Sequence, residues 1–287
     1  MKDTQFYFNG QFLPATTACI SPFDRGFLFG DAVYEVIPVY EQQAFKLKEH
    51  FERFKQSLSK INLTLPLTFD NMLQITQQLI HQPHSFEAIS IYWHISRGSN
   101  FKRTHAPSHE MSPTCFACIQ PRIPHTLESY QKGFKAILHA DIRWALNEIK
   151  STAMLANVLL SHQAQANDAQ ETLLHHDGYL VEGASSNLFY MLNGVLRTPP
   201  KQPRMLSGIT RDYVISVAQH LGLLVNEEPC PIEDLEHCDE LYITSSTREI
   251  MPITQLGHHP IGSGRVGPNW RGLFQGFQNH LNTCMPS

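Results

Sequence analysis

Three two-residue turn signals constrain the fold of this chain more than any other feature of its sequence. Asn9-Gly10, Asp177-Gly178 and Asn193-Gly194 each lie between short runs rich in aromatic or aliphatic residues. Such dipeptides favour tight turns whose twist matches that of two antiparallel strands. The sequence therefore predicts β-hairpins in both halves of the chain and argues against a doubly wound parallel sheet.

The remaining apolar patterns predict further strands and a smaller number of helices. Strands are predicted at about 33–40, 44–47, 89–95, 114–120, 135–140, 188–192, 195–198 and 241–245. Helices are predicted at about 47–61, 68–81, 151–166, 210–221 and 270–281. Because the strands outnumber the helices and connect mostly through hairpins, we expect an α+β fold with antiparallel or mixed sheets.

A polar segment with two prolines divides the pattern near its middle. Residues 121–129 (PRIPHTLES) have no apolar periodicity, and a chain of 287 residues is long enough for two domains. We interpret this segment as a linker between a small N-terminal α/β domain, 1–120, and a larger C-terminal cofactor-binding domain, 130–287.

The composition excludes several classes of function. Lys+Arg number 22 and Asp+Glu number 26, so there is no basic excess for contacts along a nucleic acid. No apolar stretch approaches the roughly 18 residues that cross a bilayer, and residues 1–12 do not resemble a secretory signal. We therefore expect a cytoplasmic protein that binds neither nucleic acid nor membrane.

Several motifs suggest metal, redox or nucleotide chemistry, and each is better explained in another way. Cys115 and Cys118 form a CxxC inside a predicted buried strand, which favours packing thiols. Residues 262–267 match GxGxxG, but too little chain follows for a dinucleotide-binding unit. The adjacent histidine pairs 175–176 and 258–259 lack metal-site spacing, so we expect no metal.

Four features are compatible with catalysis, although none is decisive alone. Residues 207–210 precede a predicted helix, and 244–247 place four hydroxyls after a strand; either could bind an anion or be an ordinary cap or polar loop. Lys150 has apolar neighbours, and a lysine amine in such a site can form a Schiff base, although most lysines are simply solvated. Arg103 and His105 would project to one side of an extended chain and could clamp a carboxylate.

Seven segments, spread in order over nearly the whole chain, form a more specific pattern. They are FNGQF (8–12), DRGFLFGDAVYEV (24–36), HFERFKQS (50–57), DIRWALNEIKS (141–151), VEGASSNLF (181–189), SGITRD (207–212) and ELYITSSTREIMPI (240–253). Together they resemble the fold-type IV, or class IV, pyridoxal-phosphate-dependent aminotransferases. The resemblance implies a small α/β domain, a larger domain with a mixed, barrel-like sheet, pyridoxal 5'-phosphate as cofactor and a homodimer.

The resemblance also implies roles for individual residues. Lys150 would hold the cofactor as a Schiff base and move the substrate's proton, Glu182 would pair with the pyridine nitrogen, and Arg53 would bind the cofactor phosphate. The other cofactor-binding residues that it implies are Leu206 at one face of the ring and Ile209, Thr210, Ser245 and Ser246 at the phosphate.

Within the family, the substrate-binding segments are closest to D-amino-acid transaminase. There, an Arg-x-His pair and a tyrosine hold the substrate α-carboxylate, and the matching residues here are Arg103, His105 and Tyr34. Residues 182–187 read EGASSN, whereas branched-chain enzymes are closer to EGTGEN. We therefore expect amino transfer from a D-amino acid, by default D-alanine, to a 2-oxo acid, by default 2-oxoglutarate.

Two alternatives within the family stay open at this point. They are 4-amino-4-deoxychorismate lyase and a branched-chain L-amino-acid transaminase, both of which would share Lys150 and Glu182. The sequence also departs from the family pattern at Phe27, Leu28 and Arg248. These positions could change the preference for the substrate side chain without changing the class of reaction.

Overall fold

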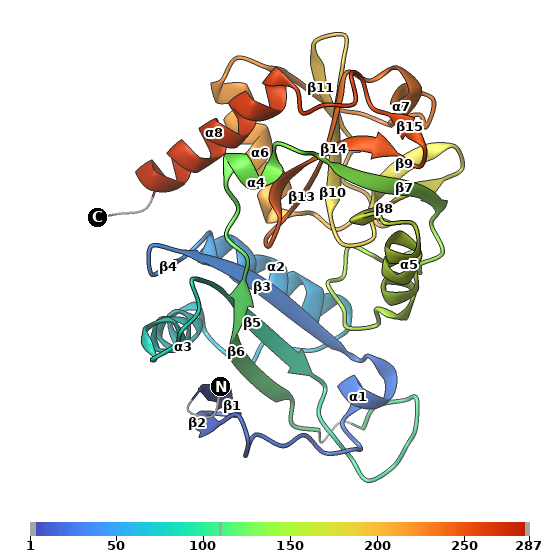
Figure 1. Ribbon diagram of the computed structural model, residues 1–287. Helices are drawn as coiled ribbons and strands as arrows, with labels where there is room; N and C mark the ends of the chain where they lie inside the picture. The colour runs from blue at the N-terminus through green and yellow to red at the C-terminus, as the bar shows by residue number, and fades with distance from the viewer. Residues whose placement is uncertain (1–3, 109–110, 285–287) are drawn as a thin grey trace. The chain divides into compact units, whose positions relative to one another are not determined.

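The computed structural model describes residues 4–108 and 111–284, and its chain forms two compact units (Figure 1). The first unit contains Met1–Pro124 and Ile149–Met154, and the second contains His125–Glu148 and Leu155–Ser287. The segment Ile149–Met154 therefore packs with the first unit, although the sequence analysis assigned it to the C-terminal domain. The domain limits expected from the sequence, with a linker at 121–129, stay a prediction.

The first unit is built on a six-stranded antiparallel sheet. Its strands lie in the order β2-β1-β6-β5-β3-β4. Its elements are β1 (Gln5–Phe8), β2 (Gln11–Pro14), α1 (Arg25–Phe29), β3 (Ala32–Tyr40), β4 (Gln43–Ala44), α2 (Leu47–Lys60), α3 (Phe69–His81), β5 (Ala88–Ser96) and β6 (Thr114–Arg122). The apolar core lies between this sheet and helices α2 and α3, where Phe54, Leu79 and Trp93 are fully buried in one cluster. The helical and strand periodicities of the sequence therefore predict this core correctly.

A buried ionic cluster attaches α2 to the centre of this sheet. The Glu35 carboxylate of β3 is fully buried and accepts hydrogen bonds from Arg53 Nε at 2.7 Å and Arg53 Nη2 at 2.6 Å. His50 Nδ1 lies 2.7 Å from the same carboxylate. Burial opposes ionisation of Glu35, but the charges and hydrogen bonds of Arg53 and His50 outweigh it and hold the pKa of Glu35 well below its usual range. The cluster thus fixes the position of α2 along β3.

The second unit contains a nine-stranded mixed sheet that curls into a half-barrel. Eight of its strands lie in the order β12-β11-β10-β13-β14-β7-β8-β9, and β15 pairs with β14. Its strands are β7 (Phe134–Ala140), β8 (Glu171–His176), β9 (Tyr179–Gly183), β10 (Asn187–Leu192), β11 (Val195–Thr198), β12 (Leu224–Glu227), β13 (Glu240–Ser245), β14 (Glu249–Leu256) and β15 (His259–Pro260). Its helices are α4 (Leu127–Tyr130), α5 (Leu155–Ala166), α6 (Ile209–His220), α7 (Asp234–His237) and α8 (Pro268–Cys284). The α+β class and the mixed sheet expected from the sequence are confirmed.

All three turn signals form the hairpins that the sequence predicts. They connect β1 to β2, β8 to β9 and β10 to β11. The two central residues of each turn have positive φ, from 44° at Asn9 to 93° at Gly10. Asn, Asp and Gly tolerate this conformation better than other residues, which is why these dipeptides are informative.

The structure differs from the predicted elements in several places. Residues 151–154 are not helical, and α5 begins only at Leu155, because the preceding segment lies along β3. The predicted strand 44–47 is shorter, since Lys46 has a φ of 52° and α2 begins at Leu47. Strand β14 was not predicted, because Pro252 lies in its interior and a proline usually argues against a strand.

The cysteine and glycine motifs are structural in the part of the chain that is described. Cys115 and Cys118 are buried in β6, and burial raises the pKa of Cys115 to about 12. The GxGxxG segment is a loop before α8, and a side chain at Gly267 would overlap the Glu240 carboxylate. Across residues 4–108 and 111–284, no group of three or more His, Cys, Asp or Glu residues could hold a metal ion. The same residues form no helix that is long and apolar enough to span a membrane.

The Glu35 cluster makes stability depend on acid pH. We expect Glu35→Gln to lower the free energy of unfolding at pH 7 by about 1–3 kcal/mol, because it removes a charged partner from a buried guanidinium. The folded-state pKa of Glu35 lies below 4.5, its value in the absence of the protein environment. The ionic contribution is therefore complete above about pH 4.5 and is lost as the pH falls below it.

Urea denaturation of both proteins from pH 7 to pH 3 measures this difference. Glu49→Gln on the exposed side of α2, where Glu49 pairs with Lys46 at 3.2 Å, is the matched control and should change stability by less than about 0.5 kcal/mol. A Glu35→Gln deficit that does not shrink towards pH 3 would contradict the proposed ionisation of Glu35.

Candidate active site

Backbone hydrogen bonds hold Lys150 beside the beginning of β3. Its N–H donates to Ser57 Oγ at 3.2 Å, and its carbonyl accepts from the Tyr34 N–H at 3.0 Å. Two residues later, the Thr152 N–H donates to the Ala32 carbonyl at 3.0 Å. The segment around Lys150 thus extends the edge of β3, and the position of the lysine is set by tertiary contacts rather than by a helix of its own.

The Lys150 side chain lies against a tyrosine that the sequence analysis assigned to the substrate. Its Nζ is 4.3 Å from the centroid of the Tyr34 ring, a distance typical of a cation–π contact. The Tyr34 ring stacks in turn on Tyr92, with centroids 5.7 Å apart. Since Tyr34 and Glu35 are neighbours on one strand, their side chains point to opposite faces of the sheet. The structure therefore brings together two of the predicted site residues, Lys150 and Tyr34.

Arg53 is oriented from behind by the Glu35 cluster. Two of its guanidinium nitrogens bind the Glu35 carboxylate, and its side chain is 10% exposed. A guanidinium held in this bidentate way has lost most of its rotational freedom. Its predicted role as a ligand of the cofactor phosphate stays a prediction, and the structure adds Glu35 and His50 as the residues that fix its orientation.

Arg103 and His105 lie on the loop between β5 and β6, where both are exposed. The guanidinium carbon of Arg103 is 5.2 Å from the centroid of the Phe29 ring, and the His105 ring is 5.4 Å from the same ring. The structure thus places the two predicted carboxylate ligands side by side on one aromatic residue of α1. Tyr34, the third predicted substrate ligand, lies next to Lys150.

In the second unit, the Glu182 carboxylate is buried and has partners on both oxygens. Oε1 accepts from Arg143 Nη1 at 2.7 Å, and Oε2 accepts from Asn187 Nδ2 at 3.1 Å and from the Leu206 N–H at 3.2 Å. Burial raises the pKa of Glu182 to about 7, and the ion pair with Arg143 acts against this rise. Such a carboxylate is suited to accept a hydrogen bond from a protonated ring nitrogen.

Arg143 and Asn187, which orient this carboxylate, were not predicted from the sequence. Arg143 is itself held by Asp141, at 2.9 Å from Nε and 3.0 Å from Nη2. Both residues lie in segments that match the family, DIRW and EGASSN, so the signal was present. The motifs do not reveal that these residues bind Glu182, because Arg143 is 39 positions from Glu182 and meets it only in the folded chain.

A candidate anion site lies at the beginning of α6. The helix starts at Ile209 after Gly208, which has no side chain to cap it, so its first N–H groups are suited to an anion. Gly208 is required because a Cβ there would overlap Asn187 Oδ1. The Asn187 amide also donates to the Leu206 carbonyl at 2.9 Å.

The hydroxyl-rich turn after β13 lies beside the same residues. Asn187 pairs with Thr244 across the β10–β13 ladder, and Ser245 and Ser246 follow directly. The Thr244 hydroxyl is buried and, among the described residues, has no hydrogen-bond partner. The segment before α6 and the end of β13 therefore both adjoin Asn187. The roles of Leu206, Ile209, Thr210, Ser245 and Ser246 in binding the cofactor stay predictions.

Arg248, a departure from the family pattern, has a structural contact in this unit. Its Nη1 donates to the Glu171 carboxylate at 2.7 Å, which also accepts from the Ser185 and Ser186 hydroxyls at 2.9 and 2.8 Å. Glu171 was not identified from the sequence. It connects the turn after β13 to the small-residue turn that follows Glu182.

These donor sets fit the cofactor that the sequence predicts. A lysine amine, a buried carboxylate with oriented oxygens and a helix start with hydroxyls are the groups that an aldehyde, a pyridine nitrogen and a phosphate ester require. Their residue roles remain predictions, since geometry alone does not assign them.

Comparison with known proteins identifies the family. The family model for amino-transferase class IV matches residues 32–256. The D-alanine aminotransferase of Staphylococcus epidermidis is 33% identical over 280 residues, covering 98% of this chain and 99% of that protein. The enzyme of the same name from Staphylococcus aureus strain N315 is 31% identical over 279 residues, covering 97% and 98%.

Solved structures agree with this result. A branched-chain amino acid aminotransferase from Escherichia coli superposes with a TM-score of 0.87 at 25% identity, covering 96% of this chain and 93% of that chain. The branched-chain enzyme from Thermobaculum terrenum, solved in its PLP form, gives 0.86 at 23% identity, covering 98% and 94%. The chain therefore belongs to the class IV aminotransferases, and it is a pyridoxal-phosphate-dependent aminotransferase, as its sequence predicts.

Proposed function

We propose that this aminotransferase moves the amino group of a D-amino acid, by default D-alanine, to a 2-oxo acid, by default 2-oxoglutarate. The observation on which this depends is the pairing of Arg103 and His105 on one aromatic side chain, which presents a guanidinium and an imidazole together to a carboxylate. The names of the relatives that are 31–33% identical over almost the whole chain support the same substrate class.

When bound, pyridoxal phosphate would supply an electron sink for the α-carbon of the substrate, and the chain would supply the proton transfer and the orientation. Lys150 would hold the cofactor through Nζ and would move the proton at the α-carbon. The contact with Tyr34 limits where the amine can go. Glu182, held by Arg143, Asn187 and the Leu206 N–H, keeps a proton on the pyridine nitrogen.

Two further sets of residues would bind the cofactor phosphate and the substrate carboxylate. We propose that the N–H groups of Ile209 and Thr210, the hydroxyls of Ser245 and Ser246 and the Arg53 guanidinium bind the cofactor phosphate, while Leu206 packs against its ring. Arg103, His105 and Tyr34 would hold the substrate α-carboxylate. A charge-assisted and often bidentate contact of this kind orients the substrate as well as binding it.

A branched-chain L-amino-acid transaminase is the alternative that a specific observation favours. The Escherichia coli enzyme of that name has nearly the same fold at 25% identity. We rank it second because D-alanine aminotransferases share more of the sequence, at 33% identity. The remaining alternative, 4-amino-4-deoxychorismate lyase, would use the same lysine and carboxylate.

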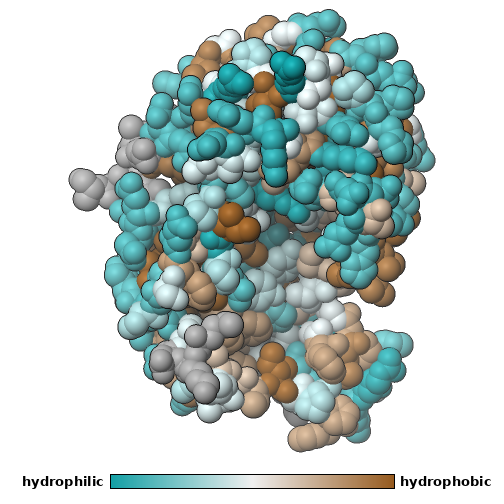
Figure 2. Space-filling view, viewed as in Figure 1, coloured by the Kyte–Doolittle hydropathy of each residue, from teal (hydrophilic) through white to brown (hydrophobic). Residues whose placement is uncertain are grey.

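We also propose that the chain forms a homodimer and is cytoplasmic. Hydrophobic side chains reach the surface among hydrophilic ones (Figure 2), and in the first unit Phe27 and Phe101 are 76% and 92% exposed. Large exposed aromatic side chains are typical of a surface that a partner covers. The described cysteines, among them exposed Cys19, are free thiols, as is usual in a reducing compartment. Sedimentation velocity at micromolar concentration should give twice the mass of one chain, and a monomer would contradict the dimer.

Replacing the cofactor lysine tests the assignment of Lys150. We expect Lys150→Ala to lose the visible absorbance of covalently bound pyridoxal phosphate and to lower kcat by at least about a thousandfold, because both the covalent link and the proton carrier are removed. Lys55→Ala, an exposed position on α2, is the control and should keep both properties. A wild-type protein that stays colourless with added pyridoxal phosphate, or a Lys150→Ala variant that retains the band, would overturn the assignment.

A panel of amino donors tests the substrate class. With 2-oxoglutarate as acceptor, we expect D-alanine to be used and L-leucine and aminodeoxychorismate not to be. D-glutamate gives no net reaction with 2-oxoglutarate, so it is tested with pyruvate as acceptor, where we expect it to be used. Arg103→Met should lower kcat/KM for D-alanine by about tenfold to a thousandfold, whereas Lys102→Met on the same exposed loop should change it less than about threefold. Turnover of L-leucine without D-alanine would favour the branched-chain alternative, and release of pyruvate from aminodeoxychorismate would favour the lyase.

A further inference from the structure

A buried arginine of α1 holds the backbone of the loop that presents Arg103 and His105. Arg25 is 5% exposed, and its Nη1 and Nη2 donate to the carbonyls of Thr104 and His105 at 2.6 and 2.7 Å. The residues of the loop from Phe101 to Ser108 are themselves exposed. The two shortest contacts made by the Arg25 guanidinium are therefore with the main chain of the proposed carboxylate-binding pair.

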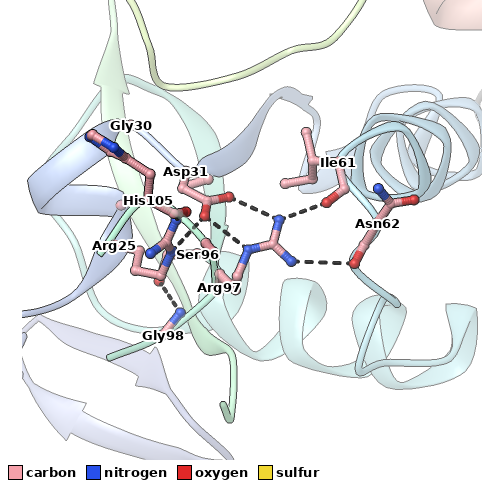
Figure 3. Close-up of polar contacts among 12 residues, drawn as sticks. Arg25, Gly30, Asp31, Ile61, Asn62, Ser96, Arg97, Gly98 and His105 are labelled. Carbon is pink, nitrogen blue, oxygen red and sulfur yellow. Dashed lines mark hydrogen bonds and ion pairs between the residues drawn. The ribbon is translucent and has the colours of Figure 1, made fainter. Parts of the chain in front are cut away.

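The third nitrogen of the same guanidinium is fixed by an acidic residue (Figure 3). Arg25 Nε donates to Asp31 Oδ2 at 2.8 Å, and the Arg25 N–H donates to the Gly98 carbonyl at 2.8 Å. Every guanidinium nitrogen of Arg25 thus has a short contact, and its backbone is attached to the end of β5. These contacts fix the orientation of the side chain, which reaches from the first residue of α1 to the loop.

Asp31 shares its charge with a second arginine, which makes the arrangement rigid. Arg97 donates to both Asp31 oxygens, at 2.8 and 3.0 Å, and to the carbonyls of Ile61 and Asn62 at 2.6 and 3.3 Å. Burial opposes ionisation of Asp31, but the two guanidinium groups outweigh it and lower its pKa. Arg25 and Arg97 therefore both bind the Asp31 carboxylate. Each also donates to a different segment of backbone, Thr104 and His105 for Arg25, and Ile61 and Asn62 for Arg97.

Helix α1 also supplies the surface on which the functional side chains rest. Phe29 follows Arg25 by four residues, so both side chains lie on the same side of the helix. The guanidinium carbon of Arg25 is 4.9 Å from the centroid of the Phe29 ring, the ring that Arg103 and His105 also contact. Backbone and side chains of the loop are thus positioned by a single short helix.

We propose that Arg25 is a positioning residue that sets the place of Arg103 and His105 and thereby the affinity for the substrate carboxylate. This inference rests on the proposed function of that pair. Arg25 acts through the carbonyls of Thr104 and His105 and does not itself touch the substrate. A lysine at this position would keep the positive charge beside Asp31 but could not donate to three acceptors in a planar fork.

Hydrogen exchange tests the anchoring independently of any activity. In the holoenzyme, we expect Arg25→Lys to speed amide exchange of peptides covering 101–108 by at least about tenfold, because two charge-assisted hydrogen bonds to this backbone are lost. Arg97→Lys is the matched control, since it also binds Asp31 and two carbonyls. It should speed exchange at 61–65 and affect exchange at 101–108 much less than Arg25→Lys does, because Arg25 keeps its own contacts with the loop. Equal exchange of 101–108 in the wild type and Arg25→Lys would overturn the anchoring.

Kinetics test the consequence for the carboxylate. We expect Arg25→Lys to raise KM for D-alanine by about tenfold while kcat changes less than about threefold, and to leave the half-reaction with D-alaninol, which has no carboxylate, unchanged. In an Arg103→Met background the same substitution should have a smaller effect on KM, because only the contact through His105 is left for it to disturb. Additive losses, or a KM that stays at the wild-type value while the loop exchanges faster, would refute the positioning role.

The same variants separate this inference from the proposed function. If Arg103→Met leaves D-alanine kinetics unchanged, the proposed carboxylate site is wrong, whatever the exchange data show for Arg25. If Arg103→Met is severe and Arg25→Lys is silent in both measurements, the carboxylate site stands and only the positioning role fails. Retention of visible cofactor absorbance in each variant shows that the comparison is made on folded holoenzyme.

Discussion

The buried carboxylate of Glu35 is the interaction on which the first unit depends. A charge without solvent is tolerated only when its partners are close and well oriented, and here Arg53 and His50 provide them. This requirement fixes α2 on β3. Tyr34 directly precedes Glu35 on this strand. The same requirement therefore also fixes the Tyr34 ring, against which the Lys150 amine lies, and the Tyr34 N–H, which donates to the Lys150 carbonyl. The ion pair on one face of the sheet therefore contributes to the position of Lys150 and Tyr34.

Local patterns in the sequence predict the elements whose stability is local. The three hairpins follow from dipeptides that tolerate positive φ, and the core helices follow from apolar spacing. The predicted start of α5, at residue 151, was wrong because the conformation there depends on contacts with a distant part of the chain. Residues 151–154 have helical neighbours, but the Thr152 N–H donates to Ala32 of β3 and Ser151 forms a bridge with Val33, more than a hundred positions away in the chain. The apolar spacing within residues 151–154 carries no information about such a distant partner. The non-helical path of the chain after Lys150 therefore could not be predicted from the sequence.

The same distinction holds within the candidate site. Lys150 and Glu182 were identified because they lie in segments that match the family, and membership in that family is confirmed. Their supporting residues were not identified, because a buried arginine or asparagine has no sequence pattern of its own. Arg143 reaches Glu182 across 39 positions. These residues can be identified because a buried carboxylate requires hydrogen-bond donors. Which carboxylates are buried is known only from the folded structure.

Arg25 shows why this need matters for specificity. An exposed loop with polar residues has many accessible conformations, and a ligand that must order it first binds more weakly by the cost of that ordering. The charge of Arg103 alone would not avoid that cost, since charge favours encounter more than it fixes geometry. Hydrogen bonds from a buried guanidinium to the loop's own carbonyls act before the substrate arrives. Preorganisation of the loop therefore depends on a residue about eighty positions earlier in the chain, whose side chain is hidden from the substrate that it helps to select.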